Sequence, residues 1–446
     1  MNSKIIFVLF LVAAYILSGC STGTQNDGNN TKTSGQELTI VNEQTQIEPA
    51  ELTKDHEATK EQDTTNGQNS TNTGDSANET DLVKEQISEM TLEEKIGQMF
   101  IVGFKGYEVH ESIQTMLQKY HVGGVILFGN NIKSADQLLQ LVNSLKDIHT
   151  ENELPLFISV DEEGGRISRM PPQLHKLPSS ESIGEVNNSE FSYNIGNVIA
   201  EEIKTFGFNM DFAPVLDIFS NPKNTVIGDR AFGKDAETVS KLGVQTMKGI
   251  KAGGIIPVVK HFPGHGDTQV DSHVGLPSVS YDMERLKSFE FVPFKTAIDS
   301  QADAVMISHI LLERIDPENP ASLSKTVITD LLREQMNFDG VVITDDMTMG
   351  AIEKNYIISD AVVKSVNAGS DIILVCHGYD NQVNVMDTLK VAVENGSVSE
   401  ERIDESVCRV LKLKIKYGLT DDKTPSINIE EINKKIDAVL SKWYNR

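Results

Sequence analysis

The 446-residue chain contains few cysteines, few basic residues and a single tryptophan. Three cysteines, at positions 20, 376 and 408, are too few for a disulfide framework, and we expect Cys376 and Cys408 to be reduced. The 40 Lys and Arg residues are outnumbered by 65 Asp and Glu residues, so the formal net charge is −25. Because binding to a phosphate backbone needs a basic face, we expect no nucleic acid as a partner.

The first apolar run of the chain is too short for a membrane-spanning helix. It covers residues 5–17, whereas a helix needs about 20 apolar residues to cross a bilayer. Its place near the N-terminus, after one lysine, predicts an export signal over residues 1–19. The sequence Leu17-Ser18-Gly19-Cys20 resembles the lipobox of bacterial lipoproteins. This resemblance implies a lipid anchor on Cys20 and a location on the outer face of the cytoplasmic membrane; an ordinary signal peptide with a chance cysteine is the alternative.

Residues 20–85 lack the side chains that build a core. From residue 21 to residue 80 there is no Phe, Tyr or Trp, and 11 acidic residues stand against 3 lysines. Such a segment buries too little apolar surface to offset the entropy lost on ordering it. We therefore predict a disordered, polar and acidic linker over this range.

Residues 86–420 alternate short apolar runs with amphipathic stretches. Thr91 and Glu94 form a capping-box pattern, which predicts a first helix there. The stretches 134–148, 237–250 and 358–369 fit crossover helices. Eight runs are typical of strands buried on both faces: 99–104, 123–128, 156–161, 209–215, 255–261, 304–309, 340–346 and 371–376. This α/β pattern predicts a single (β/α)8 TIM-type barrel, with a doubly wound sheet as the alternative; residues 421–446 are expected to form a helical tail.

Charged side chains stand where several of these apolar runs end. Asp161 ends the third run, Lys260 and His261 end the fifth, Ser308 and His309 end the sixth, and Asp345 lies at the end of the seventh. In a barrel the carboxyl ends of the strands meet on one face, where the active sites of this fold lie. Turn and cap residues alone would not account for Lys and His at such positions. These six residues are therefore candidates for a functional site.

The densest group of reactive side chains is KHFPGHGDTQVDSH at 260–273, which its Gly and Pro residues predict to be a loop. In an acid/base interpretation Asp271 would hold His273, since residues i and i+2 of an extended stretch point to the same side. In a structural interpretation, some of the residues only brace the loop. In a metal interpretation, the zinc ligands would be His261, His265, Asp267 and His273.

The second motif is VVITDDMTM at 341–349. A carboxylate at the end of a buried strand, here Asp345, suits a nucleophile or a group that stabilises an oxocarbenium ion. Its neighbour Asp346 suits the N-cap of a following helix.

Together these two motifs resemble glycoside hydrolase family 3, in particular its β-N-acetylglucosaminidase branch, and the resemblance extends from about residue 91 to residue 418. It implies a retaining mechanism in which Asp345 attacks the anomeric carbon. It also implies that His273, paired with Asp271, is the general acid/base, a role for which most glycosidases use a second carboxylate. Histidine ordinarily titrates near pH 6.5, which permits both halves of this role around neutral pH.

The resemblance also implies which residues hold the sugar. The segment DEEGGRISR at 161–169 contributes Asp161 and Arg169, and GDRAF at 228–232 contributes Arg230. Lys260 and His261 complete this set. Carboxylates and cations of this kind can grip the vicinal hydroxyls of a neutral sugar.

These observations predict a monomeric, exo-acting β-N-acetylglucosaminidase that trims cell-wall glycans or muropeptides and needs no cofactor or metal. Because a second anionic carboxylate is absent, phosphate would be less repelled, and a phosphorylase of the same family is an alternative. Two alternatives from other classes are a zinc-dependent hydrolase built on the His/Asp loop and a non-catalytic sugar-binding lipoprotein.

Overall fold

The computed structural model describes residues 75–149, 154–268 and 270–444. The predicted export signal, Cys20 and residues 20–74 of the predicted linker lie outside these ranges. Among the described residues, we find no helix with the length and apolar character needed to span a bilayer.

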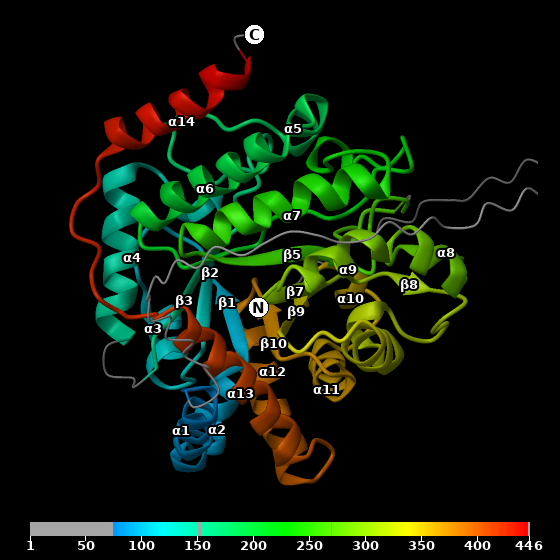
Figure 1. Cartoon of the computed structure of the whole chain (residues 1–446). Coiled ribbons are helices and arrows are strands. Elements are labelled where there is room, and N and C mark those ends of the chain that lie inside the picture. The colour runs from blue at the N-terminus through cyan, green and yellow to red at the C-terminus, as the bar shows by residue number, and fades with distance from the viewer. Residues whose placement is uncertain (1–74, 150–153, 269, 445–446) are drawn as a thin grey trace, which may run out of the picture. The chain divides into compact units, whose positions relative to one another are not determined.

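Eight parallel strands close into a barrel (Figure 1). Each of the eight predicted apolar runs contributes one strand, which confirms the (β/α)8 fold and rules out an open doubly wound sheet. In their order around the barrel, the strands are β1 (Phe100–Gly103), β10 (Ile372–Val375), β9 (Val341–Asp346), β7 (Ala304–Ile307), β5 (Ile256–Phe262), β4 (Met210–Asp211), β3 (Phe157–Val160) and β2 (Gly124–Leu127).

Helices surround the barrel and follow most of its strands. They are α1 (Asp75–Glu89), α2 (Leu92–Gln98), α3 (Glu111–Gln118), α4 (Ala135–His149), α5 (Ser180–Val186), α6 (Ser189–Thr205), α7 (Ala236–Ala252), α8 (Met283–Ser288), α9 (Phe291–Asp299), α10 (Gly350–Glu353), α11 (Ile358–Ala368), α12 (Tyr379–Glu394), α13 (Glu400–Lys416) and α14 (Ile429–Tyr444). Short elements are the 3-10 turns η1 (Gly129–Asn131), η2 (Gly228–Arg230) and η3 (Ala321–Leu323), the π-helix η4 (Thr326–Gln335), and the paired strands β6 (Ser278–Val279) and β8 (Leu311–Leu312). The predicted capping box of α2 is present, with Thr91 and Glu94 each accepting from the other's backbone N–H.

Two apolar cores explain why the strands are apolar on both faces. Alternate strand residues such as Ile101 and Met210 fill the barrel interior, while their neighbours pack against the helices. Val410 and Leu413 of α13 join the interior cluster and close the amino ends of the strands. The opposite end, where the strands finish, is left for polar side chains.

The folded part begins earlier than predicted. Helix α1 starts at Asp75, inside the range expected to be linker, and packs against α13. Its Val83 and Ile87 are buried in the main core. The boundary at residue 85 is therefore wrong, because two apolar residues on one helical face anchor a segment whose average composition is polar.

The predicted C-terminal helix is present as α14, and it packs on α6 (Figure 1). Ile432 and Ile436 are buried, and the ring of Trp443 lies 5.7 Å from that of Phe191. Before this helix, Asp421 accepts from the Leu156 N–H at 3.0 Å, so the tail is held to the barrel at more than one point.

The revised boundary can be tested with two neighbouring residues of α1. Val83 is completely buried, whereas Leu82 is 58% exposed. We expect Val83→Ala to lower the free energy of unfolding by about 2 kcal/mol, because it removes buried methyl groups from a packed core. Leu82→Ala should change it by less than about 0.5 kcal/mol. Denaturant unfolding of both variants measures the difference, and equal effects would show that α1 is not part of the folded body.

Candidate active site

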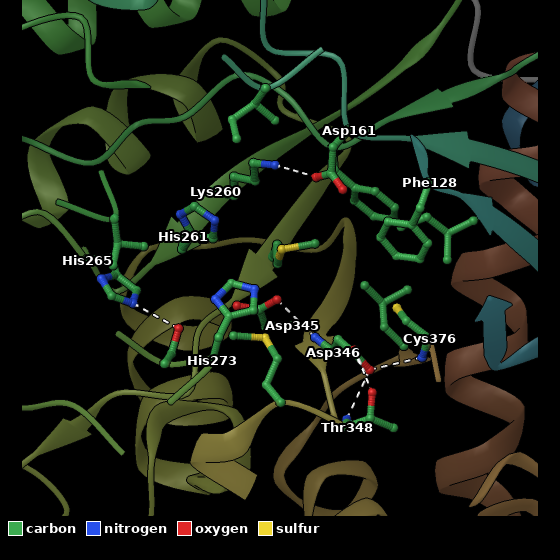
Figure 2. Close-up of a pocket in the computed structure, with 18 of the residues that line it drawn as sticks. Phe128, Asp161, Lys260, His261, His265, His273, Asp345, Asp346, Thr348 and Cys376 are labelled. Carbon is green, nitrogen blue, oxygen red and sulfur yellow. Dashed lines mark hydrogen bonds and ion pairs between the residues drawn. The ribbon is translucent and has the colours of Figure 1, made fainter. Parts of the chain in front are cut away.

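A cavity of about 330 Å³ opens at the carboxyl ends of the barrel strands (Figure 2). Its floor is apolar and belongs to the barrel interior, with Phe212, Met306 and Leu374 among its residues. The predicted site residues that line it are Asp161, Arg169, Arg230, Lys260, His261, His273 and Asp345. The remaining predicted residue, Asp271, contacts His273 from outside the cavity wall. The structure thus brings together side chains from strands far apart in the sequence.

One wall of the cavity is a buried network of charges. Lys260 Nζ lies 2.7 Å from Asp161 Oδ1 and 2.6 Å from Glu163 Oε1. Arg230 donates to both oxygens of Glu163 at 2.8 Å. Burial acts to raise the pKa of the Glu163 carboxyl, but the charges of Arg230 and Lys260 outweigh it and hold that pKa below its usual range. Glu163, which the sequence analysis did not select, is therefore the ionised centre of this wall.

Lys260 and His261 both line the cavity although they are consecutive residues of β5. The pairing of β5 with β7 shifts register between Val259 and Phe262, and the Lys260–His261 peptide bond is cis. His261 Nδ1 lies 2.6 Å from Asp217 Oδ2, and its Nε2 lies 3.4 Å from Arg230. Lys260 and His261 belong to β5, as the predicted strand 255–261 requires, and the predicted loop begins only after Phe262.

Asp217 is a second residue that the sequence analysis missed. It follows β4 in a segment that runs beside β5, where Val215 bridges to Lys260. Burial acts to raise the pKa of its carboxyl, but the charge and hydrogen bond of His261 lower it overall. The sequence offered only a weak signal for this residue, because Asp217 stands two positions after the run 209–215 and between the apolar residues Leu216 and Ile218.

Asp345 lies at the end of β9 and is partly buried. The backbone N–H of Asp346 donates to its Oδ1 at 2.9 Å. Burial acts to raise the pKa of the Asp345 carboxyl, but the imidazoles of His309 and His261 and this hydrogen bond lower it overall. An ionised carboxylate that faces the cavity is suited to nucleophilic attack.

His273 and Asp271 form the predicted pair. His273 Nδ1 lies 2.9 Å from Asp271 Oδ1, and the His273 ring faces the same cavity as the Asp345 carboxylate (Figure 2). The pair belongs to a turn and not to an extended stretch, because the same Asp271 oxygen accepts the His273 backbone N–H at 2.8 Å. Burial acts to raise the pKa of the Asp271 carboxyl, but the two hydrogen bonds from His273 lower it overall.

The zinc interpretation does not fit the observed contacts. Among the described residues, no three His, Cys, Asp or Glu side chains are grouped so that they could hold a metal ion. His261 Nε2 lies 3.4 Å from the Arg230 guanidinium, whose charge disfavours a metal cation there, and the two ring nitrogens of His265 contact Thr268 and Ser272. These histidines therefore point to protein partners instead of one common centre.

Asp346 organises the turn after β9. Its Oδ1 accepts the backbone N–H of Thr348 at 3.0 Å and that of Cys376 at 2.9 Å. It caps this turn and not a helix, since the N-cap of α10 is Met349. The nearby Cys376 is a free thiol, and burial followed by the charge of Asp346 raises its pKa well above the usual range. Cys408 is also free, as predicted.

Behind the cavity wall, three carboxyl groups share one buried region. Glu162 follows β3, Asp211 lies in β4 and Glu202 lies in α6, and all three are buried. The Glu162 N–H donates to Asp211 at 2.9 Å, while Glu202 Oε2 and Asp211 Oδ2 have no protein partner among the described residues. Burial raises the pKa of Glu162 to about 7, and burial followed by the neighbouring carboxyls raises that of Glu202. This group is held largely protonated in the folded protein.

Known proteins are similar to this chain in sequence and in fold. The model of the glycosyl hydrolase family 3 N-terminal domain matches residues 91–413. A β-hexosaminidase A from Pseudoalteromonas piscicida is 31% identical over 367 residues, which cover 73% of this chain and 61% of that protein. A β-hexosaminidase from Nitrosomonas eutropha is 33% identical over 317 residues, which cover 69% of this chain and 90% of that protein.

A solved structure extends the comparison. The family 3 β-N-acetylglucosaminidase from Paenibacillus sp. str. FPU-7 is 40% identical, with a TM-score of 0.75, and the match covers 79% of this chain and 69% of that one. The barrel and the carboxylate-lined mouth define a glycoside hydrolase. The chain belongs to glycosyl hydrolase family 3, on its β-hexosaminidase branch.

The buried carboxyl cluster makes stability depend on pH. Between about pH 4 and pH 7 the unfolded chain ionises these carboxyls while the folded chain keeps their protons, so their contribution to stability falls as pH rises. Glu202→Gln removes one of the three acids. We expect this variant to be more stable than the parent by about 1 kcal/mol or more near pH 8, with a weaker dependence on pH.

Denaturant unfolding at several pH values measures this effect. Glu201→Gln is the matched control, because Glu201 lies on the same helix but pairs at the surface with Lys435 at 3.0 Å. A Glu202→Gln protein with the same pH dependence as the parent would contradict the assignment.

Proposed function

We propose that the protein is a retaining exo-β-N-acetylglucosaminidase that releases terminal β-linked N-acetylglucosamine from peptidoglycan-derived glycans. The observation that carries this proposal is the meeting of Asp345 with the Asp271–His273 pair at one cavity of about 330 Å³. The apolar floor of the cavity closes one end, which favours action at a chain terminus.

The first step of the proposed mechanism forms a glycosyl-enzyme. The ionised carboxylate of Asp345 attacks the anomeric carbon of the bound sugar. Because Asp271 engages Nδ1 of His273, the Nε2–H is the proton donor to the departing glycosidic oxygen. The bond from the anomeric carbon to that oxygen breaks as the bond to Asp345 forms.

In the second step, neutral His273 accepts a proton from a water molecule. The oxygen of this water attacks the anomeric carbon and displaces Asp345, so the β configuration is restored. The sugar hydroxyls are held during both steps by Asp161, Arg169 and Lys260. Lys260 is itself held by ion pairs with Asp161 and Glu163.

Product analysis by NMR tests the reaction. With a chromogenic aryl N-acetyl-β-glucosaminide as substrate, we expect free N-acetylglucosamine that appears first as the β anomer, with or without phosphate in the buffer. Asp345→Asn should lower kcat by about 10³-fold or more, because it removes the nucleophile while keeping the shape of the side chain. Formation of a sugar phosphate would instead support a phosphorylase, and first appearance of the α anomer would contradict retention.

We also propose that the enzyme is exported and lipid-anchored through Cys20. This rests on the apolar run at 5–17, on the lipobox-like residues that follow and on the polar segment after them. We expect Cys20→Ala to abolish incorporation of a radiolabelled fatty acid and to shift the enzyme from the membrane fraction to the soluble fraction. Cys408→Ala is the control, and a wild-type chain without label would disprove the anchor.

A further inference from the structure

A chain of hydrogen bonds runs from the sugar-binding wall to the loop that carries His273. Asp217 connects His261 to His265 at the start of this chain of bonds. Its Oδ2 lies 2.6 Å from His261 Nδ1, and its Oδ1 accepts the His265 backbone N–H at 2.5 Å. His265 continues it, with Nε2 at 3.2 Å from the hydroxyl of Ser272 (Figure 2). Ser272 lies in the sequence between the two members of the acid/base pair.

The His265 ring has a fixed orientation. Its Nδ1 lies 2.8 Å from the hydroxyl of Thr268, which also donates to the His265 carbonyl at 3.1 Å. His265, Thr268 and Ser272 are all buried. Burial lowers the pKa of the imidazole, although the charge of Asp217 opposes this effect, so the ring is neutral and bonds one hydroxyl at each nitrogen.

On its other side, the loop rests on the segment that follows Asp345. The backbone N–H of Ala351 donates to the Ser272 carbonyl at 2.9 Å. Gly350 approaches the loop so closely that a Cβ there would lie 2.5 Å from the His273 carbonyl oxygen. The side chains of Asp271 and His273 themselves are 41% and 69% exposed. Ser272 is therefore the buried anchor of an otherwise exposed pair.

We propose that His265 and Ser272 are positioning residues that fix the distance of the His273 imidazole from the scissile bond. The proposal rests on the acid/base role proposed for His273 and goes beyond it. An exposed pair on a turn has little packing of its own, so its distance from Asp345 is set by Ser272, which His265 holds from the barrel side and Ala351 holds from the nucleophile side. Displacement of a catalytic group by about 1 Å can cost about 100-fold in rate.

The dependence of rate on the leaving group separates this role from a purely structural one. A phenyl leaving group needs a proton from the general acid, whereas a dinitrophenyl leaving group departs as a stable anion without one. We use kcat/KM because it reports only the steps up to formation of the glycosyl-enzyme. For Ser272→Ala in the full-length enzyme, we expect kcat/KM to fall by about tenfold or more for phenyl N-acetyl-β-glucosaminide and by less than about threefold for the dinitrophenyl substrate.

Two further variants make the result interpretable. His273→Ala should show the same selectivity with a larger loss. Ser192→Ala is the matched control, since Ser192 is also buried and donates to the Leu242 carbonyl at 2.7 Å. It lies on α6, where it contacts α7, and it does not line the cavity. This control should leave kcat/KM for both substrates unchanged within about twofold.

Equal losses for the two substrates, or no loss for either, would overturn the positioning role of Ser272. His265→Gln provides a second reading, because it should reproduce the selectivity of Ser272→Ala if the imidazole holds the hydroxyl. If His273→Ala itself shows no selectivity, the acid/base assignment fails and the inference falls with it. If the wild-type enzyme turns over neither substrate, the proposed activity is at fault.

Discussion

The ionised carboxylate of Glu163, bound between Lys260 and Arg230, is the interaction on which the site depends. It joins three parts of the chain: the loop after β3, strand β5 and the turn η2. A buried carboxylate is costly unless cations compensate it, and here two of them do so at 2.8 Å or less. Glu163 also holds the side chains of Lys260 and Arg230 in place at the cavity surface. Asp161, which pairs with Lys260, adds a further negative charge to this wall. Removal of either cation would leave part of the negative charge of the buried Glu163 carboxylate without a partner. The residues of this wall therefore depend on one another for their stability.

The barrel could be predicted from the sequence because its strands are buried on both faces. Such strands have nearly continuous apolar runs, and the charged residues at the ends of several runs mark the mouth, as at Asp161 and Asp345. What could not be predicted is how the loops meet across the mouth. The partnership of Glu163 with Arg230 joins residues 67 apart, and nothing in the local pattern of either specifies the other. Helix α1 was missed for a related reason, because its burial depends on a face offered by α13.

Asp271 and His273 form the predicted contact, but they do so in a turn and not in the predicted extended stretch. An extended stretch and an Asx turn both bring residues i and i+2 together, and the local sequence does not distinguish them. The turn makes a further difference, since it exposes the pair and transfers the task of positioning to the buried residue between them. The cluster of Glu162, Glu202 and Asp211 was beyond local reasoning altogether, because its members come from a loop, a helix and a strand.

The place of α1 has a consequence for the relation between the stability of the fold and the cavity. Gln86 of α1 shares a shallow hollow with Pro155, which precedes β3, and with Lys414 of α13, the helix that closes the amino ends of the strands. Helix α1 therefore lies at one end of the barrel, and the cavity opens at the other. Substitutions in α1 can therefore alter the stability of the barrel without touching any residue that lines the cavity.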